Sequence, residues 1–122
     1  MSSETENGSN INELPIFIKW TDFMKWLLIT VEKFPKKVRF TFSDRIINLT
    51  LDIVEDLIEA RYSRQKVATL RRANLNLEKI RILWRICFEL RVIPQKTYEH
   101  AIYSVNEVGK MIGGWLKQQE GK

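Results

Sequence analysis

Cysteine and histidine each occur once in the 122 residues of this sequence. The single cysteine, Cys87, cannot form a disulfide within the chain. The single histidine, His100, follows Glu99 directly and lies opposite the apolar side of its predicted helix, so the Glu-x-x-His pairs of a two-metal helical bundle are missing. No cluster of cysteine and histidine has the spacing of a zinc site either. We therefore expect neither a metal nor another cofactor.

Long apolar runs, alternating strand patterns and glycine-rich phosphate loops are also missing. No stretch of about 18 uncharged apolar residues occurs, so no membrane span is predicted. The N-terminus lacks the basic-then-apolar order of a signal peptide and carries Glu4, Glu6 and Glu13 instead. No nucleophile has a base near it in the sequence, since His100 is far from Cys87. These absences predict a cytoplasmic protein without catalytic residues, and an enzyme is the least favoured class.

Basic residues outnumber acidic ones, with 20 Lys and Arg against 15 Asp and Glu and a formal net charge of +5. The charge is uneven, because residues 1–14 carry three acids and no base, which leaves 20 bases against 12 acids, or +8, on the remainder. Such an excess favours an acidic partner, nucleic acid above all. The apolar share of 44% is sufficient for one domain with a hydrophobic core.

The chain is predicted to consist of a flexible acidic tail at residues 1–14, a folded body at 15–118 and a C-terminal tail at 119–122. In four stretches of the body, apolar residues recur every three and four positions, which is typical of amphipathic helices. Pro35 ends the first stretch, although the second helix could begin there or as late as Ser43. Short connections between such helices predict an all-α, antiparallel up-down-up-down four-helix bundle.

The second predicted helix, which runs to Tyr62, has apolar residues on two sides. We assign to the core the stripe Ile47, Leu51, Val54, Ile58 and Tyr62. Ile46, Leu49 and Ile53 lie off this stripe and give more apolar surface than one face requires. The outer face is then acidic, with Asn48, Asp52, Glu55, Asp56 and Glu59. This face is either solvated or a surface for basic residues of another subunit.

The third predicted helix, residues 67–91, is also apolar on more than one side. Its main seam consists of Leu70, Ala73, Leu77, Ile80, Trp84 and Cys87, and a second set consists of Leu75, Ile82 and Ile86. Either this helix is central and touches three neighbours, or its second side is a subunit interface. Under the second interpretation we predict that Leu75, Ile82 and Ile86, together with Leu49 and Ile53, form an oligomer interface.

Positive charge gathers at the turn between the second and third helices and along one strip of the third. The residues predicted to bind nucleic acid or a protein partner are Arg61, Arg64, Lys66, Arg71, Arg72, Arg81 and Arg85, followed by Lys110 and Lys117. Clustered Lys and Arg side chains are what phosphate binding requires, although a solvated surface has the same composition. Trp26 and Tyr103 lie off their helical stripes and are candidates for base stacking. No sequence-reading motif is present, so binding without sequence specificity is expected.

Four segments of the body carry a family resemblance. They are Phe34-Pro35-Lys36 before Arg39-Phe40, Leu57-Ile58-Glu59-Ala60, Leu77-x-x-Ile80-Arg81-x-Leu83-x-Arg85 and the run Val108-Gly109-Lys110-Met111-Ile112-Gly113-Gly114-Trp115-Leu116-Lys117. Over about residues 15–118 the chain resembles the accessory variability determinant (Avd) proteins of diversity-generating retroelements. The four-helix proteins encoded in intervening sequences of bacterial 23S ribosomal RNA genes are related, but the Met-Ile-Gly-Gly-Trp ending favours the Avd proteins.

The resemblance implies a homopentameric barrel of four-helix bundles with a strongly basic surface. It implies association with the element's reverse transcriptase and template-repeat RNA, a requirement in adenine-directed mutagenic retrohoming, and no catalytic role. Arg81 and Arg85 lie in a matching segment, so the resemblance supports them most directly. Whether the nucleic acid is RNA, an RNA–DNA hybrid or DNA stays open. The alternative function is an interaction scaffold of the 23S intervening-sequence type, with no role in binding nucleic acid.

Overall fold

The computed structural model describes residues 14–121, so residues 1–13 and 122 lie outside the described range. The tail predicted for residues 1–14 falls there except for its last residue. In chain order, the described helical elements are α2 (Pro15–Thr30), η2 (Val31–Lys33), α3 (Lys36–Val38), η3 (Arg39–Ser43), α4 (Asp44–Tyr62), α5 (Lys66–Glu89) and α6 (Gln95–Glu120). This part of the chain contains no strand, which confirms the all-α prediction.

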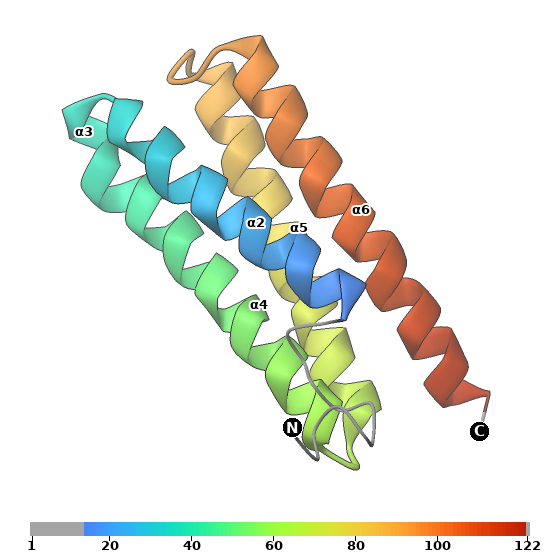
Figure 1. Ribbon diagram of the computed structural model, residues 1–122. Helices are drawn as coiled ribbons and strands as arrows, with labels where there is room; N and C mark the ends of the chain where they lie inside the picture. The colour runs from blue at the N-terminus through green and yellow to red at the C-terminus, as the bar shows by residue number, and fades with distance from the viewer. Residues whose placement is uncertain (1–13, 122) are drawn as a thin grey trace.

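The long helices α2, α4, α5 and α6 pack as a bundle in which consecutive long helices run in opposite directions (Figure 1). Helix α2 lies in front, between α4 and α6, and α5 lies behind it. α6 continues to Glu120, beyond residue 118, where the folded body was predicted to end. Among the described helices, none combines the length and the apolar character needed to cross a membrane.

The second predicted helix begins directly after Pro35, at the early end of the range that the sequence left open. α3 starts at Lys36, and a wider π-helical turn, η3, joins it to α4. Arg39 Nη2 donates hydrogen bonds to the carbonyls of Glu32, at 2.9 Å, and Phe34, at 3.2 Å. These bonds stabilise the connection between η2 and α3 because they satisfy carbonyls at the end of the preceding helix.

The connection between α5 and α6 is tight because α5 ends in a Schellman motif. The amides of Arg91 and Val92 donate to the carbonyls of Phe88 and Cys87, each at 2.9 Å. Arg91 adopts the left-handed conformation, with a φ of 60°, that this motif requires. The cap therefore lets α6 turn back against α5 after a short connection, as an up-and-down bundle requires.

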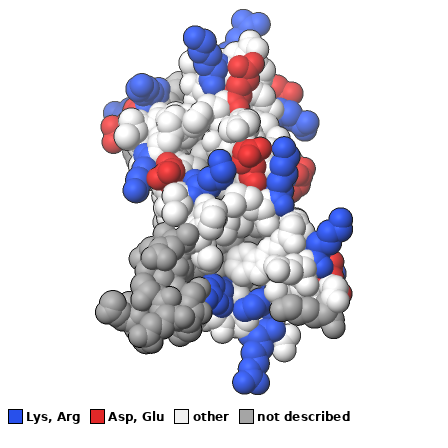
Figure 2. All heavy atoms as spheres, turned by 45° about the vertical axis from the view of Figure 1, so that its right-hand side comes forward, with Lys and Arg blue, Asp and Glu red and all other residues white. Residues whose placement is uncertain are grey.

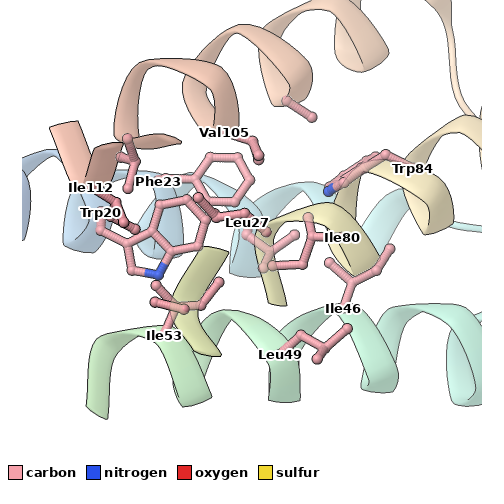
Figure 3. Close-up of a cluster of buried hydrophobic side chains, with 14 of the residues drawn as sticks. Trp20, Phe23, Leu27, Ile46, Leu49, Ile53, Ile80, Trp84, Val105 and Ile112 are labelled. Atoms are coloured by element: carbon pink, nitrogen blue, oxygen red, sulfur yellow. The ribbon is translucent and has the colours of Figure 1, made fainter. Parts of the chain in front are cut away.

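The core is built from one side of each long helix, and the side that α5 contributes is the main seam predicted from the sequence (Figure 3). The buried residues of these helices include Ile16, Trp20, Phe23 and Leu27 of α2, Leu70, Ala73, Leu77, Ile80, Trp84 and Cys87 of α5, and Ala101, Val105, Val108 and Ile112 of α6. Trp20 Nε1 donates to the Thr50 carbonyl at 3.0 Å. This bond satisfies the buried indole and ties α2 to α4.

The prediction for α4 is wrong about the side that faces the core. Its buried apolar residues are Ile46, Leu49, Ile53, Leu57 and Ala60, whereas Leu51, Ile58 and Tyr62 of the predicted stripe are exposed. Two polar residues, Thr50 and Asp56, share the buried side. The Thr50 hydroxyl donates to the Ile46 carbonyl at 2.8 Å, and Asp56 has a partner on α5. Burial of this side is tolerated because its polar groups are paired.

Candidate functional site

A strip of basic side chains follows the contact between α5 and α6. Its members are Arg71, Arg81 and Arg85 of α5 and Lys110 and Lys117 of α6. Arg81 lies in the middle of this strip, where its Nε donates to Asn106 Oδ1 at 2.8 Å and its Nη1 to Glu78 Oε1 at 3.0 Å. These two bonds hold the guanidinium between the two helices. Around it lies a hollow of about 640 Å³, whose lining also includes Asn74 and Lys110. An anion that entered this hollow would meet a guanidinium already held in place.

Gly109 of α6 makes room for this guanidinium. A Cβ atom at position 109 would lie 2.8 Å from Arg81 Nη2, which is too close unless the arginine moves. At Gly113 and Gly114 a Cβ atom would meet nothing within 4 Å. Of these three glycines, therefore, only Gly109 is explained by the close approach of a neighbouring group, and that group is the Arg81 side chain. The contacts within this chain leave Gly113 and Gly114 unexplained.

Two other predicted residues extend the strip without a bound partner. Arg85 and Lys117 are exposed, and the side chain of neither forms an ion pair or hydrogen bond with any residue that the structure describes. Figure 2 shows Lys and Arg side chains over the whole height of one face, with Asp and Glu among them mainly in the upper half. The surface is therefore of mixed charge, with an excess of bases.

Lys110 and Arg71 belong to the strip but are paired. Lys110 Nζ lies 3.4 Å from Glu107 Oε2, and Arg71 forms an ion pair with Glu120. The side chains of Lys110 and Arg71 are 78% and 66% exposed. Surface pairs of this kind contribute about 1 kcal/mol or less, so a phosphate group can replace the carboxylate.

At the turn between α4 and α5, Lys66 is committed to the backbone. Its Nζ donates to the carbonyls of Ala60 at 2.8 Å, Arg61 at 3.3 Å and Ser63 at 2.7 Å. These bonds use all three donors of the ammonium and offset the negative end of the α4 dipole. Lys66 is therefore a cap of α4, and its geometry does not support the predicted contact with phosphate.

Arg61 and Arg64 share this turn with Lys66. The Arg61 guanidinium lies over the Tyr62 ring, 5.7 Å from its centroid. Arg64 is exposed and has no ion pair within residues 14–121. The Ser63 hydroxyl accepts a hydrogen bond from the Gln65 amide at 2.9 Å. Gln65 occupies the N-cap position of α5, so Ser63 orders the turn before the helix and does not cap it.

Arg72 joins α5 to α4 in a partly buried polar network. Its Nε and Nη2 donate to Asp56 Oδ1 at 2.9 and 2.7 Å, and Nη2 also lies 3.2 Å from Glu59 Oε1. Asn76 Nδ2 donates to Asp56 Oδ2 at 3.4 Å, and the Thr69 hydroxyl donates to Glu59 Oε2 at 2.9 Å. The hydrogen bond and charge of Asp56 raise the pKa of the Arg72 guanidinium.

This network corrects the sequence prediction for Asp56, which is not on an acidic outer face, because its side chain is only 6% exposed. Arg72 is held by the carboxylates of Asp56 and Glu59, and its predicted role in binding nucleic acid or a protein partner stays a prediction. Its role in the fold can be measured directly.

Arg72→Met is expected to lower the free energy of unfolding by about 2–3 kcal/mol, because the buried Asp56 carboxylate would keep only its bond from Asn76. Arg71→Met is the matched control, since the Arg71–Glu120 pair is exposed and its loss should cost less than about 1 kcal/mol. Urea unfolding followed by circular dichroism measures both. Equal losses in the two variants would contradict a structural role for Arg72.

The five residues of the predicted oligomer interface differ in their exposure. Leu75 and Ile82 of α5 are 56% and 43% exposed, and Ile86 is half-buried. Leu49 and Ile53 are 8% and 0% exposed and lie among the core side chains (Figure 3). The interface role predicted for these two residues is wrong, because the other side of α4 faces outward.

Cys87 and His100 lie in different environments. Cys87 is buried, and this burial raises the pKa of its thiol to about 11, so the thiol stays protonated near neutral pH. His100 is exposed, and its ring lies 4.4 Å from the Trp26 ring. Within residues 14–121, no group of three or more His, Cys, Asp and Glu side chains is arranged to hold a metal ion.

Sequence reasoning missed the residues that hold the basic side chains in place. Glu78 and Asn106 hold Arg81, and Asp56 holds Arg72. Only Glu78 left a signal, because it precedes Arg81 by three residues on the same helix. The other two partners come from neighbouring helices, so their pairing depends on how the helices pack.

Comparison with known proteins gives one result. The sequence model of the family described as bAvd-like matches residues 16–119, which include α2 from its second residue and all of α4 and α5. No curated protein and no solved structure matches the chain.

Proposed function

The chain belongs to the bAvd-like family, and we propose that it is a non-catalytic accessory protein of a diversity-generating retroelement. In this role it binds the element's reverse transcriptase and template-repeat RNA in the cytoplasm, and so enables mutagenic cDNA synthesis and retrohoming. The observation that carries the proposal is the strip of basic side chains along α5 and α6 in a chain of this family.

The strip suits a phosphate backbone. The side chains of Arg85 and Lys117 have no partner among the described residues. Arg71, Arg81 and Lys110 can exchange their carboxylate partners, which are 27–58% exposed, for phosphate. From Arg71 to Arg85 the strip extends about 21 Å at the helical rise of about 1.5 Å per residue, enough for several successive phosphates. Contacts with phosphate fix position without reading base sequence. The binding is therefore proposed to be independent of sequence.

We also propose that the protein forms a homopentameric barrel. In a closed ring each subunit uses two different patches, and one patch contacts the other patch of the next subunit. Leu75 and Ile82 form an exposed apolar patch on α5, which we name the α5 patch. Leu51 and Ile58, 42% and 38% exposed, form the α4 patch. These two residues take the place of the buried Leu49 and Ile53 in the proposed interface.

Light scattering on the full chain tests both parts of the proposal. A mass near five chains is expected without RNA, and a structured RNA should raise this mass at low salt. The RNA complex should weaken steeply between about 50 and 200 mM salt, because each phosphate contact releases a counterion. A complex that is insensitive to salt would contradict binding through phosphate. A monomer that does not respond to RNA would contradict both parts.

A further inference from the structure

A groove between α2 and α6 brings together residues from distant parts of the chain. It has a volume of about 450 Å³, and Asp22 and Trp26 line it from α2 while Tyr103 and Glu107 line it from α6. Because α2 and α6 run antiparallel, Trp26 meets His100 at one end, with the two rings 4.4 Å apart. The groove adjoins the basic strip at Glu107, which is paired with Lys110, but Arg81 does not line it.

The aromatic part of the groove is held by the core. Trp26 is half-buried, and its ring centroid lies 5.5 Å from the ring centroid of Phe23 and 5.9 Å from that of Trp84. Tyr103, in contrast, is 62% exposed and has no ring contact among the described residues. The groove therefore has one fixed aromatic wall and one phenol ring available to a ligand.

The charges of the groove favour a cation. Two carboxylates, Asp22 and Glu107, line it together with one ammonium, that of Lys19. Asp22 has no ion pair within residues 14–121, and Glu107 contacts only the exposed Lys110. A guanidinium can stack on an aromatic face and donate to a carboxylate at the same time. A phosphate chain that followed this groove would instead meet two carboxylates.

We propose that this groove binds an arginine side chain from a basic segment of a protein partner. The guanidinium stacks on Tyr103 and donates to Asp22 and Glu107. α6 then separates two binding chemistries, with phosphate bound on its α5 side and arginine on its α2 side. The proposal rests on the proposed function for the existence of a protein partner, whereas its test does not require that partner.

The test measures the affinity of the full chain for a fluorescent peptide of alternating glycine and arginine by fluorescence anisotropy. Asp22→Asn combined with Glu107→Gln should lower the affinity about tenfold, because neutral amides keep the shape but lose the charge-assisted bonds. Tyr103→Ala should lower it about three- to fivefold through loss of the cation–π contact. Tyr103 is largely exposed, so this variant should keep its helical circular dichroism spectrum.

The matched control combines Asp52→Asn with Glu55→Gln, which removes the same charge from the exposed side of α4. The affinity of this control for the peptide should stay within about twofold of the original. Equal losses in the two double variants would overturn the proposal, because binding would then follow net charge alone. Tyr103→Ala that weakened a single-stranded RNA oligonucleotide but not the peptide would also overturn it, and would make the groove a platform for bases. Neither result bears on the mass measurement that tests the proposed function.

Discussion

Replacing Arg81 and Arg85 together by glutamate is expected to lower the affinity for structured RNA about a hundredfold or more. Each chain loses two positive charges from the basic strip and gains two negative ones. Helical circular dichroism should be unchanged, because Arg85 is exposed and the bonds of Arg81 to Glu78 and Asn106 are near the surface. Retrohoming in cells should be lost with the RNA complex.

The control for this variant combines Lys25→Glu with Lys37→Glu. Both lysines are exposed, and they lie on α2 and α3, outside the basic strip of α5 and α6. The change in net charge is the same, so long-range attraction of RNA falls equally in the two variants. A hundredfold loss only at Arg81 and Arg85 would support contact at the strip. Retrohoming that survived the Arg81 and Arg85 changes would show that the assignment is wrong.

Helices α2, α5 and α6 were predictable because one apolar stripe in each is dominant. In α5, for example, the seam from Leu70 to Cys87 is fully buried, and it was predicted from spacing alone. α4 presented two stripes that differ by a rotation of about 100°, the angle between successive residues of a helix. Thr50 and Asp56 made the true inner side look too polar to be buried. The hydrogen-bond partners of Thr50 and Asp56 allow this side to be buried, and those partners are known only once the chain is folded.

The basic surface was predictable as a set of residues but not as a site. Clustering in the sequence correctly marked a region rich in Arg and Lys. It could not separate Lys66, which caps α4, or Arg72, which pairs with Asp56, from Arg85 and Lys117, which have no such partner in the described chain. The distinction depends on which carbonyls and carboxylates come near each basic side chain, and the packing of the helices decides this.

The α4 and α5 patches together make a specific prediction about the ring. Ile82→Glu damages the α5 patch, and Leu51→Glu damages the α4 patch. Each change places a charge in an apolar contact, where it costs several kcal/mol, so each variant alone should give smaller assemblies by light scattering. Ile18→Glu on α2 is the control, since Ile18 is 45% exposed, close to the 43% of Ile82, and lies outside both patches. It should keep the full mass.

Mixing the two damaged variants distinguishes a ring from a self-paired interface. In a ring, the intact α4 patch of Ile82→Glu contacts the intact α5 patch of Leu51→Glu, so one interface forms and growth stops there. The mixture should therefore contain dimers with one chain of each kind, although neither variant dimerises alone. If each patch instead paired with its own copy, every variant would dimerise alone through its undamaged patch. That result, or full mass for Ile82→Glu, would contradict the pentameric barrel.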